Sequence, residues 1–457
     1  NGAERDFPLA QVHKIVFTGS ARNDSFTNNT SIPCVANGGD GDDVLTGGSG
    51  ADTLNGQGGN DTIKGGDGDD VITGGDGDDV LYGNQGDDEI HGNNGNDRIY
   101  GGRGSNTLYG DAGSDTIVAV NGAHDTRTGG TGEDFIWMDA SDTLTDVSST
   151  ETQNGDVHSV SSFLPYRYVY ADGSVATVSI DKVLDGPNLG VPQPVYANET
   201  TMDVSSQPLF ASTGPSADDI VQGESGDCYI LAPLSTDADA QPDDIRRVVV
   251  DLDDGTYAVR FFKNNVPVYE RVDGQLWMRS GKPANAGFGV EGSIWVPIVE
   301  KAYAFFRLND ASYISVANSS GFTADWKATV SYVLADDDSE NRSAQVIAWV
   351  NAGSPASDPM AARIHNGVAA LYQFIDAQQA LGNGLYAGAT AEYGNNEAFD
   401  PTLWRRAEHL FMIDHVIRDS SGTAIGIDYR NPWGTDNPVT SETAIYFFSG
   451  LAAVWSM

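Results

Sequence analysis

The sequence predicts a multidomain protein in which an N-terminal all-β solenoid, a parallel β-roll, precedes a C-terminal domain of mixed helices and strands. A nine-residue phrase recurs nine times without a gap from Gly38 to Val118, and a fixed period of this kind indicates stacked repeats. The composition then changes, and seven of the eight tryptophans follow residue 138. We therefore predict three regions: the roll at 1–137, a connector at 138–205 and the second domain at 206–457.

Each repeat combines a glycine-rich turn with a short strand that carries one aliphatic residue. Glycine permits the positive φ angles and the close backbone approach that such turns need. We expect the aliphatic side chains to point inward and to stack one coil apart; they are Leu45, Leu54, Ile63, Ile72, Leu81, Ile90, Ile99, Leu108 and Ile117. One such side chain per repeat cannot offset an entropy cost of about 1–2 kcal/mol per ordered residue, so another interaction must hold the turns.

Carboxylates supply that interaction if cations lie between them. Residues 38–118 carry 17 Asp or Glu against 3 Lys or Arg, and these like charges repel one another without counter-ions. Calcium fits best, because it takes roughly 6–8 oxygen ligands in flexible geometry, backbone carbonyls included. If two repeats make one coil, nine turns form 9 − 2 = 7 stacked pairs and up to about seven calcium sites. The predicted ligands are Asp40, Asp43, Asp52, Asp61, Asp67, Asp70, Asp76, Asp79, Asp88, Asp97, Asn106 and Asp115.

The repeats match the pattern G-G-x-G-x-D-x-U-x and resemble the calcium-binding nonapeptide repeats of the RTX family. Two worn copies, Gly19–Thr27 and Gly129–Trp137, flank the array. The resemblance implies a calcium-folded roll in a secreted, extracellular protein of bacterial origin. A calcium-rich setting agrees with that expectation, because weak calcium sites stay empty at cytosolic calcium concentrations.

The overall charge and the cysteine count exclude several classes of protein. A formal net charge of −40 argues against binding to nucleic acid or to anionic membrane surfaces. The sequence contains no apolar run of the ~18–20 residues that a membrane-spanning helix needs. The chain begins at Asn1 without a methionine, which is expected of a mature form that has lost a leader or of an engineered start. Two cysteines make no disulfide framework, and we expect Cys34 to be a free structural thiol.

The connector at 138–205 contains one recognisable element. A β-hairpin is predicted at Tyr166–Ile180, with its turn around Ala171-Asp172-Gly173. The rest of this stretch is rich in Ser, Thr, Val and Asp, and it contains no residue pattern that indicates a reaction.

Cys228 is the candidate nucleophile. Ile230, Leu231 and Leu234 have the spacing of a helix that begins at Asp227 or Cys228. A thiol at a helix N-terminus feels the positive end of the helix dipole, which lowers the thiol pKa and favours the thiolate. A neighbouring base would complete the activation of this nucleophile.

Three segments of the second domain resemble the calpain family of cysteine proteases. Gln222–Ala232 reads Q-G-E-S-G-D-C-Y-I-L-A, like the cysteine motif of that family. Trp295–Ala304 resembles its E-K-A-Y-A helix, and Tyr429–Gly434 contains its R-N-P-W-G. The resemblance covers residues 206–457 and implies an α+β papain-like protease domain with the catalytic order Cys, His, Asn. Cys228 would then attack the scissile carbonyl, while Gln222 and the Cys228 N–H would donate to the oxyanion and Asn431 would orient the imidazole.

The catalytic histidine is a choice between His409 and His415. Residues 408–418 and 423–430 are predicted to be two antiparallel strands around a tight turn. This pairing places His409 across from Asn431 or Pro432, within side-chain reach, and the family motif also aligns on His409. His415 is predicted to lie across from Ala424–Gly426 without a partner. We therefore select His409.

These residues predict a calcium-dependent cysteine endopeptidase that hydrolyses proteins or peptides through a thioester acyl-enzyme. The alternative is a calcium-folded adhesion or scaffold protein whose protease-like domain is inactive or cleaves only itself. The stretch Ile314–Asp325 favours that alternative, because it lacks the acidic glycine-rich segment that the family has there. Acyl transfer to an amine by the same residues is a third possibility. Further calcium in the protease domain stays open, because Asp251–Asp254 and Asp336–Glu340 fit solvated loops equally well.

Overall fold

The computed structural model describes most of the first third of the chain and selected parts of the remainder. The chain divides into two compact units: the first comprises Asn1–Pro165, Ser179–Pro187 and Val250–Ala258, and the second comprises Tyr166–Val178, Asn188–Val249 and Val259–Met457. The described residues are 12–146, 148, 151, 155–169, 175–180, 182, 189, 199–221, 228–263, 266–308, 330–333, 371–380, 385–389, 409–422, 424–430, 439–443 and 451–456.

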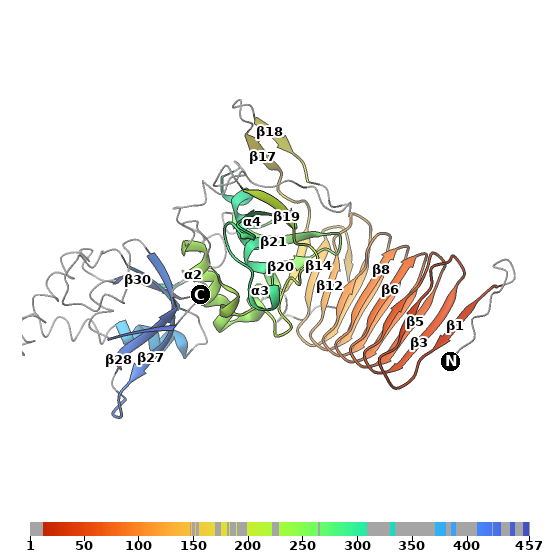
Figure 1. The fold of residues 1–457 in the computed structure, drawn as a ribbon, viewed down its shortest axis with the longest axis horizontal. Coiled ribbons are helices and arrows are strands. Elements are labelled where there is room, and N and C mark those ends of the chain that lie inside the picture. The colour runs from red at the N-terminus through yellow and green to blue at the C-terminus, as the bar shows by residue number, and fades with distance from the viewer. Residues whose placement is uncertain are drawn as a thin grey trace, which may run out of the picture. The chain divides into compact units, whose positions relative to one another are not determined.

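The first unit is a parallel β-roll whose successive strands alternate between two eight-stranded sheets (Figure 1). One sheet has the order β1-β3-β5-β7-β9-β11-β13-β15 and the other β16-β14-β12-β10-β8-β6-β4-β2. The strands are β1 (Ile15–Thr18), β2 (Ser25–Thr27), β3 (Cys34–Asp40), β4 (Val44–Thr46), β5 (Thr53–Gly58), β6 (Thr62–Asp67), β7 (Val71–Asp76), β8 (Val80–Gln85), β9 (Glu89–Asn94), β10 (Arg98–Tyr100), β11 (Thr107–Ala112), β12 (Thr116–Ala119), β13 (Thr126–Thr131), β14 (Phe135–Asp139), β15 (Thr143–Leu144) and β16 (Val157–Val160).

Two repeats form one coil, as predicted. Leu54 pairs with Ile72 and Ile72 pairs with Ile90, so each aliphatic residue stacks on the one two repeats later. All nine predicted aliphatic residues have an exposed fraction of 0% and form the thin core of the roll. The strands are longer than expected, because most of them continue through the first glycines of the next turn.

The roll extends beyond the nine regular repeats at both ends. The two worn copies contribute β2 and β14, which pair in parallel with their neighbours. Strands β15 and β16 also join the two sheets, although they lie in the stretch that the sequence assigned to the connector. The predicted hairpin is confirmed as the antiparallel pair β17 (Tyr166–Val169) and β18 (Val175–Val178); its turn lies outside the described residues.

The second unit combines helices with antiparallel sheets, in agreement with the predicted α+β class. Its helices include η2 (Ala217–Asp219), α2 (Cys228–Ala240), α3 (Pro242–Val248), η3 (Val290–Gly292) and α4 (Trp295–Leu308), and residues 371–379 are also helical. None of the helices in the described part of the chain is long and apolar enough to cross a membrane.

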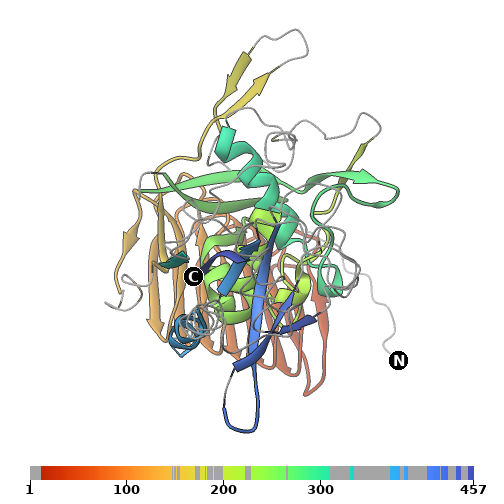
Figure 2. The same ribbon diagram turned by 90° about the vertical axis from the view of Figure 1, so that its left-hand side faces the viewer.

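Three sheets contain strands of the second half of the chain: β19-β23-β24, β20-β21-β22 and the six-stranded β25-β30-β26-β27-β28-β29. Figure 2 shows β27 and β28 in blue as a long hairpin. The strands are β19 (Thr200–Asp203), β20 (Val249–Asp251), β21 (Thr256–Lys263), β22 (Val266–Asp273), β23 (Gln275–Arg279), β24 (Lys282–Pro283), β25 (Val330–Val333), β26 (Leu385–Ala389), β27 (His409–Arg418), β28 (Ala424–Arg430), β29 (Val439–Thr443) and β30 (Leu451–Ser456).

Helix α2 packs directly on the six-stranded sheet. The Ser235 hydroxyl donates to Met412 Sδ on β27 at 3.3 Å, and the Thr236 hydroxyl donates to Leu385 O on β26 at 3.1 Å. Both hydroxyl-bearing residues are buried, so these polar contacts fix the helix against the sheet. The helix that begins at the candidate nucleophile is thereby tied to the strand that begins at the candidate histidine.

Candidate functional site

The roll contains two columns of buried carboxylates in which each member binds the coil before it. Asp61 Oδ1 accepts the Asp43 N–H at 2.7 Å, and Asp79 Oδ1 accepts the Asp61 N–H at 2.7 Å, both across 18 residues. The first column consists of Asp43, Asp61, Asp79, Asp97, Asp115 and Asp134. The second column consists of Asp52, Asp70, Asp88, Asn106, Asp125 and Asp142. Each carboxylate thus uses one oxygen to join consecutive coils.

The second oxygen of most of these carboxylates is buried without a hydrogen-bond partner. This holds for Oδ2 of Asp43, Asp61, Asp70, Asp79, Asp88, Asp97, Asp115 and Asp134. A Cβ built on Gly74 would lie 2.2 Å from Asp79 Oδ2 and 2.8 Å from Gly92 O, so these two oxygens converge on one point. An oxygen buried in this way carries an uncompensated desolvation penalty of about 1–3 kcal/mol or more. A cation that binds both oxygens would remove that penalty.

The chemistry of this site suits calcium. Among the described residues, no three Asp, Glu, His or Cys side chains gather into a metal-binding group. Most of the regular turns instead offer one carboxylate oxygen together with a backbone carbonyl, and calcium accepts carbonyl ligands readily. The glycine at the first position of each turn leaves the space that the ion would occupy, as Gly74 does beside Asp79.

Burial raises the pKa values of the column carboxyls. The pKa rises to about 6 for Asp61, to about 7 for Asp79 and to about 8 for Asp115. Desolvation is the main cause, and neighbouring carboxylates raise the pKa values further. The hydrogen bonds from backbone N–H groups oppose this shift, because they stabilise the charged form. Without a cation, these groups therefore resist ionisation near neutral pH.

Three of the predicted ligands lie outside the columns. Asp40, Asp67 and Asp76 are exposed at the ends of their strands. Asp67 Oδ1 accepts from the Gln85 amide and Asp76 Oδ1 from the Asn94 amide, each at 2.7 Å. These side chains cross-link neighbouring coils at the surface, and a calcium role for them stays a prediction.

The candidate catalytic residues can be located only along the backbone. Cys228 is the first residue of α2, which confirms the predicted start of this helix. His409 is the first residue of β27, and Asn431 follows directly after the last residue of β28. Since Met412 pairs with Arg430 in this antiparallel hairpin, β27 begins and β28 ends at the same end of the strand pair. Gln222 and Asn431, and the side chains of Cys228 and His409, lie outside the described residues.

The partner of His415 differs from the prediction. His415 pairs with Asp428 rather than with Ala424–Gly426, and its Nε2 lies 2.8 Å from Asp428 Oδ2. The prediction that His415 meets no partner is therefore wrong. The reason is an irregularity between Ile413 and His415, which shifts the pairing by one residue, and a turn that lies further along the chain than assumed.

One buried residue close to the cysteine motif escaped the sequence analysis. Asp219 has an exposed fraction of 0% and accepts four hydrogen bonds. The donors are the backbone N–H groups of Ser216 (2.9 Å) and Val290 (2.8 Å), the Ser293 hydroxyl (2.7 Å) and the Trp295 indole (2.8 Å). Asp219 precedes Gln222 by three residues in the sequence. Its carboxylate therefore ties η2 to the start of α4. No spacing in the sequence marks it, because three of its four donors come from a segment 71–76 residues later.

The acidic turn at Asp251–Asp254 binds its own backbone. Asp251 Oδ1 accepts the Asp253 N–H at 2.9 Å, and Asp254 Oδ1 accepts the Thr256 N–H at 3.1 Å. These hydrogen bonds are typical of a polar turn, which is the solvated-loop alternative that the sequence offered for this segment. The other acidic cluster, Asp336–Glu340, lies outside the described residues.

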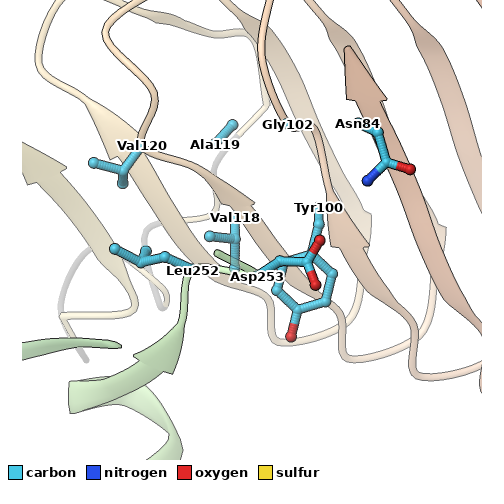
Figure 3. A pocket seen from close by; sticks show the side chains of 8 residues that line it. All are labelled: Asn84, Tyr100, Gly102, Val118, Ala119, Val120, Leu252 and Asp253. Carbon is cyan, nitrogen blue, oxygen red and sulfur yellow. The ribbon is translucent and has the colours of Figure 1, made fainter. Parts of the chain in front are cut away.

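A small cavity in the first unit is not a substrate cleft. Its volume is about 20 Å³, which is room for one water molecule (Figure 3). It is lined by Asn84, Tyr100, Gly102, Val118, Ala119, Val120, Leu252 and Asp253. None of the candidate catalytic residues is among them, so this cavity has no part in peptide-bond cleavage.

Comparisons with known proteins agree with both halves of this arrangement. The family model of the calpain family cysteine proteases matches residues 199–437, which is 239 of the 457 residues. The model of the RTX calcium-binding nonapeptide repeat matches residues 35–63, 56–90 and 91–123. Two curated plant proteins, the calpain-type cysteine proteases DEK1 of Zea mays and ADL1 of Oryza sativa subsp. japonica, are each 34% identical over 107 residues. That match covers 22% of this chain and 5% of each relative, so the chain corresponds to a small part of those proteins. With a protease-family match over more than half of its length, the chain belongs to the calpain family of cysteine proteases, and its N-terminal array is a set of RTX calcium-binding repeats.

Proposed function

We propose that this protein is a calcium-dependent cysteine endopeptidase whose nucleophile is Cys228. The position of Cys228 as the first residue of α2, inside the segment matched by the protease family, carries this proposal. The positive end of the helix dipole at that position favours the thiolate, which is the reactive form of the nucleophile. The substrates are proteins or peptides, the class on which cysteine peptidases act.

The proposed reaction proceeds in two steps. The Cys228 thiolate attacks the scissile carbonyl and forms a thioester, and the imidazolium of His409 protonates the leaving amine. Water then hydrolyses the thioester with His409 as the general base. The Gln222 amide and the Cys228 N–H donate to the oxyanion, and Asn431 holds the imidazole in the productive tautomer. The backbone supports the pairing of His409 with Asn431, because β27 begins and β28 ends at the same end of the hairpin.

Calcium enters this proposal through the roll. The unpartnered Oδ2 atoms and the carbonyls that face them would hold the ions, which neutralise the columns and make the folded coils stable. Sites of this kind fill at the millimolar calcium found outside cells, so we propose a secreted protein, of bacterial origin as RTX repeats typically are.

The test is casein cleavage by the full chain across a calcium titration, with far-UV circular dichroism on the same samples. Cys228→Ala should keep the calcium-dependent fold and lose activity by roughly 10³-fold or more, because no other group forms the acyl-enzyme. Cys34→Ala is the matched control, since Cys34 is a buried free thiol of the roll. Activity that survives in Cys228→Ala would refute the mechanism. A wild-type chain that folds with calcium but cleaves nothing would favour the scaffold alternative.

A further inference from the structure

The two carboxylate columns of the roll end differently. All six members of the first column, up to Asp134, keep a buried Oδ2 without a hydrogen-bond partner. In the second column only Asp70 and Asp88 do so. At its start, Asp52 Oδ2 accepts the Gly48 N–H at 2.7 Å. After Asp88 the next member of the column is Asn106, which carries an amide instead of a carboxylate.

The turn of Asn106 lacks the pair of oxygens found in the regular turns. A Cβ built on Gly101 would lie 3.0 Å from Asn106 Nδ2, and its next neighbours would be side-chain carbons of Leu108 and Ala119. An amide N–H and two methyl carbons cannot ligate calcium. Asn106 Oδ1 still accepts the Asp88 N–H at 2.9 Å, so this residue keeps the backbone link of the column and loses the metal site.

The side chain of Asn121 takes the place of a cation in the next coil. The link from the Asn106 N–H to Asp125 Oδ1 spans 19 residues instead of 18, so the chain has one extra residue here. Asn121 Nδ2 donates to Gly102 O and lies 3.2 Å from Asp125 Oδ2 and 3.5 Å from Gly104 O. Two glycine carbonyls and a column carboxylate thus converge on one buried donor, as they would on a metal ion.

Arg127 supplies the positive charge. It pairs in register with Leu108, where the other repeats have an inward aliphatic residue, and its exposed fraction is 0%. Its Nη2 lies 3.1 Å from Asp125 Oδ2 and 2.7 Å from Asp142 Oδ2, and it also donates to Ala119 O. Arg127 Nε and Nη1 have no hydrogen-bond partner, so the main effect of this guanidinium is to neutralise two successive carboxylates of the column.

A second cation acts on the same end of the roll. Lys182 Nζ lies 2.5 Å from Asp139 Oδ1, and it also donates to Val160 O at 3.4 Å. The other oxygen of Asp139 accepts the N–H groups of Asn121 and Gly122, at 3.2 and 2.5 Å. Asp139 is therefore neutralised by the chain itself, and it anchors the loop that carries Asn121.

We propose that calcium occupies the second column only before Asn106, that Asn121 and Arg127 take the place of the ion in the coils that follow, and that Lys182 neutralises Asp139 beside them. These three side chains are part of the chain and are present at every calcium concentration, whereas bound calcium stabilises only by mass action. The coils around residues 119–145 therefore keep their second-column side folded without calcium, although Asp134 of the first column still offers a calcium-binding oxygen there, and they form the permanent end on which the calcium-dependent turns stack. This inference does not depend on protease activity.

The test is hydrogen–deuterium exchange with mass spectrometry on the metal-depleted full chain, before and after addition of calcium. Peptides from residues 119–145 should be protected without calcium, whereas peptides from residues 43–100 should gain protection only when calcium is added. If both segments lose and regain protection together, the proposal is wrong.

Two variants assign the effect to the proposed residues. Arg127→Leu should remove the calcium-free protection of residues 119–145, while Arg98→Leu, a change at an exposed arginine of β10, should leave it intact. Asn121→Asp replaces the amide donor with a carboxylate. It should make this coil depend on calcium and add one ion per chain in native mass spectrometry. Calcium-free protection that persists in Asn121→Asp would overturn the proposal even if Arg127→Leu fails to fold.

Discussion

At the scale of single residues, the proposed calcium sites of the roll depend on glycines, which have no Cβ. Eight column carboxylates each have one oxygen that binds the backbone of the neighbouring coil and one that has no hydrogen-bond partner among the residues that the structure describes. The space beside the second oxygen exists because the first residue of the turn has no Cβ, as at Gly74. Gly74 has no positive φ, so its need for glycine comes from this space and not from backbone strain.

Gly74→Ala should therefore weaken calcium binding, because its Cβ would crowd both Asp79 Oδ2 and the backbone carbonyl of Gly92. Its Cβ would lie 2.2 Å from Asp79 Oδ2, in the space that the ion would occupy. This overpacking should lower the free energy of unfolding by about 1–3 kcal/mol. Gly58→Ala is the matched control, because its Cβ would meet Asp40 Oδ1 at an ordinary 3.7 Å. A calcium titration followed by circular dichroism should show a higher midpoint for Gly74→Ala alone. Equal calcium midpoints in both variants would show that the space beside Gly74 does not hold the ion.

At the scale of elements, the hairpin β27–β28 contains both candidate catalytic histidines, His409 and His415. The sequence predicted both strands to within one residue at each end. The details of their pairing depend on irregularities beside His415 and Arg418, which no residue pattern reveals. These irregularities place His415 opposite Asp428, three residues along β27 from Met412, which pairs with Arg430, the last residue of β28.

His409→Ala should abolish peptide-bond cleavage, because the thiolate would lose its proton acceptor and the leaving amine its proton donor. His415→Ala is the matched control on the same strand. It removes the contact of a largely exposed histidine with the mostly buried Asp428, which affects the hairpin and no step of the proposed reaction, so activity should stay within about two-fold. The kcat/KM of both variants, measured with a peptide substrate at saturating calcium, decides between the two histidines. Loss of activity in His415→Ala with retention in His409→Ala would reverse the assignment.

At the scale of the whole molecule, the stability of the calcium-free roll depends on pH through the ionisation of its buried carboxyls. The pKa values of Asp70 and Asp79 rise to about 7 and that of Asp115 to about 8, mainly through burial. These values lie above the ordinary value of about 3.9 for an unfolded chain, so folding without calcium favours the protonated carboxyls. Their contribution to the stability of the calcium-free roll is complete below about pH 4 and is lost as the pH rises through 6–8.

The metal-depleted chain should therefore keep more of its β-roll at pH 5 than at pH 8, and saturating calcium should remove this difference. Far-UV circular dichroism and hydrogen exchange of residues 43–100 at the two pH values measure the effect. Calcium binding at pH 8 should restore the signal, because the ion replaces the protons that the carboxylates have lost. A calcium-free roll that is more stable at pH 8 than at pH 5 would show that burial does not control these carboxyls.

The sequence by itself determined the architecture of the roll, its inward aliphatic residues and the order of the protease motifs. A period of nine repeats the same local geometry in each turn, so the positions of Ile72 and Asp79 within one repeat apply to all the others. The start of α2 at Cys228 could also be predicted, because helix spacing is a local property.

Only the tertiary structure decided where the regular pattern ends. The role of Arg127 depends on its register with Leu108, and the role of Lys182 on a segment that returns to the end of the roll. Asp219 receives donors from η3 and α4, far along the chain. These contacts join residues that are distant in sequence. The local spacing of residue types therefore does not show which side chains become buried or in which register two strands pair. The periodic part of the protein follows from its repeats, whereas its exceptions follow from how the chain packs on itself.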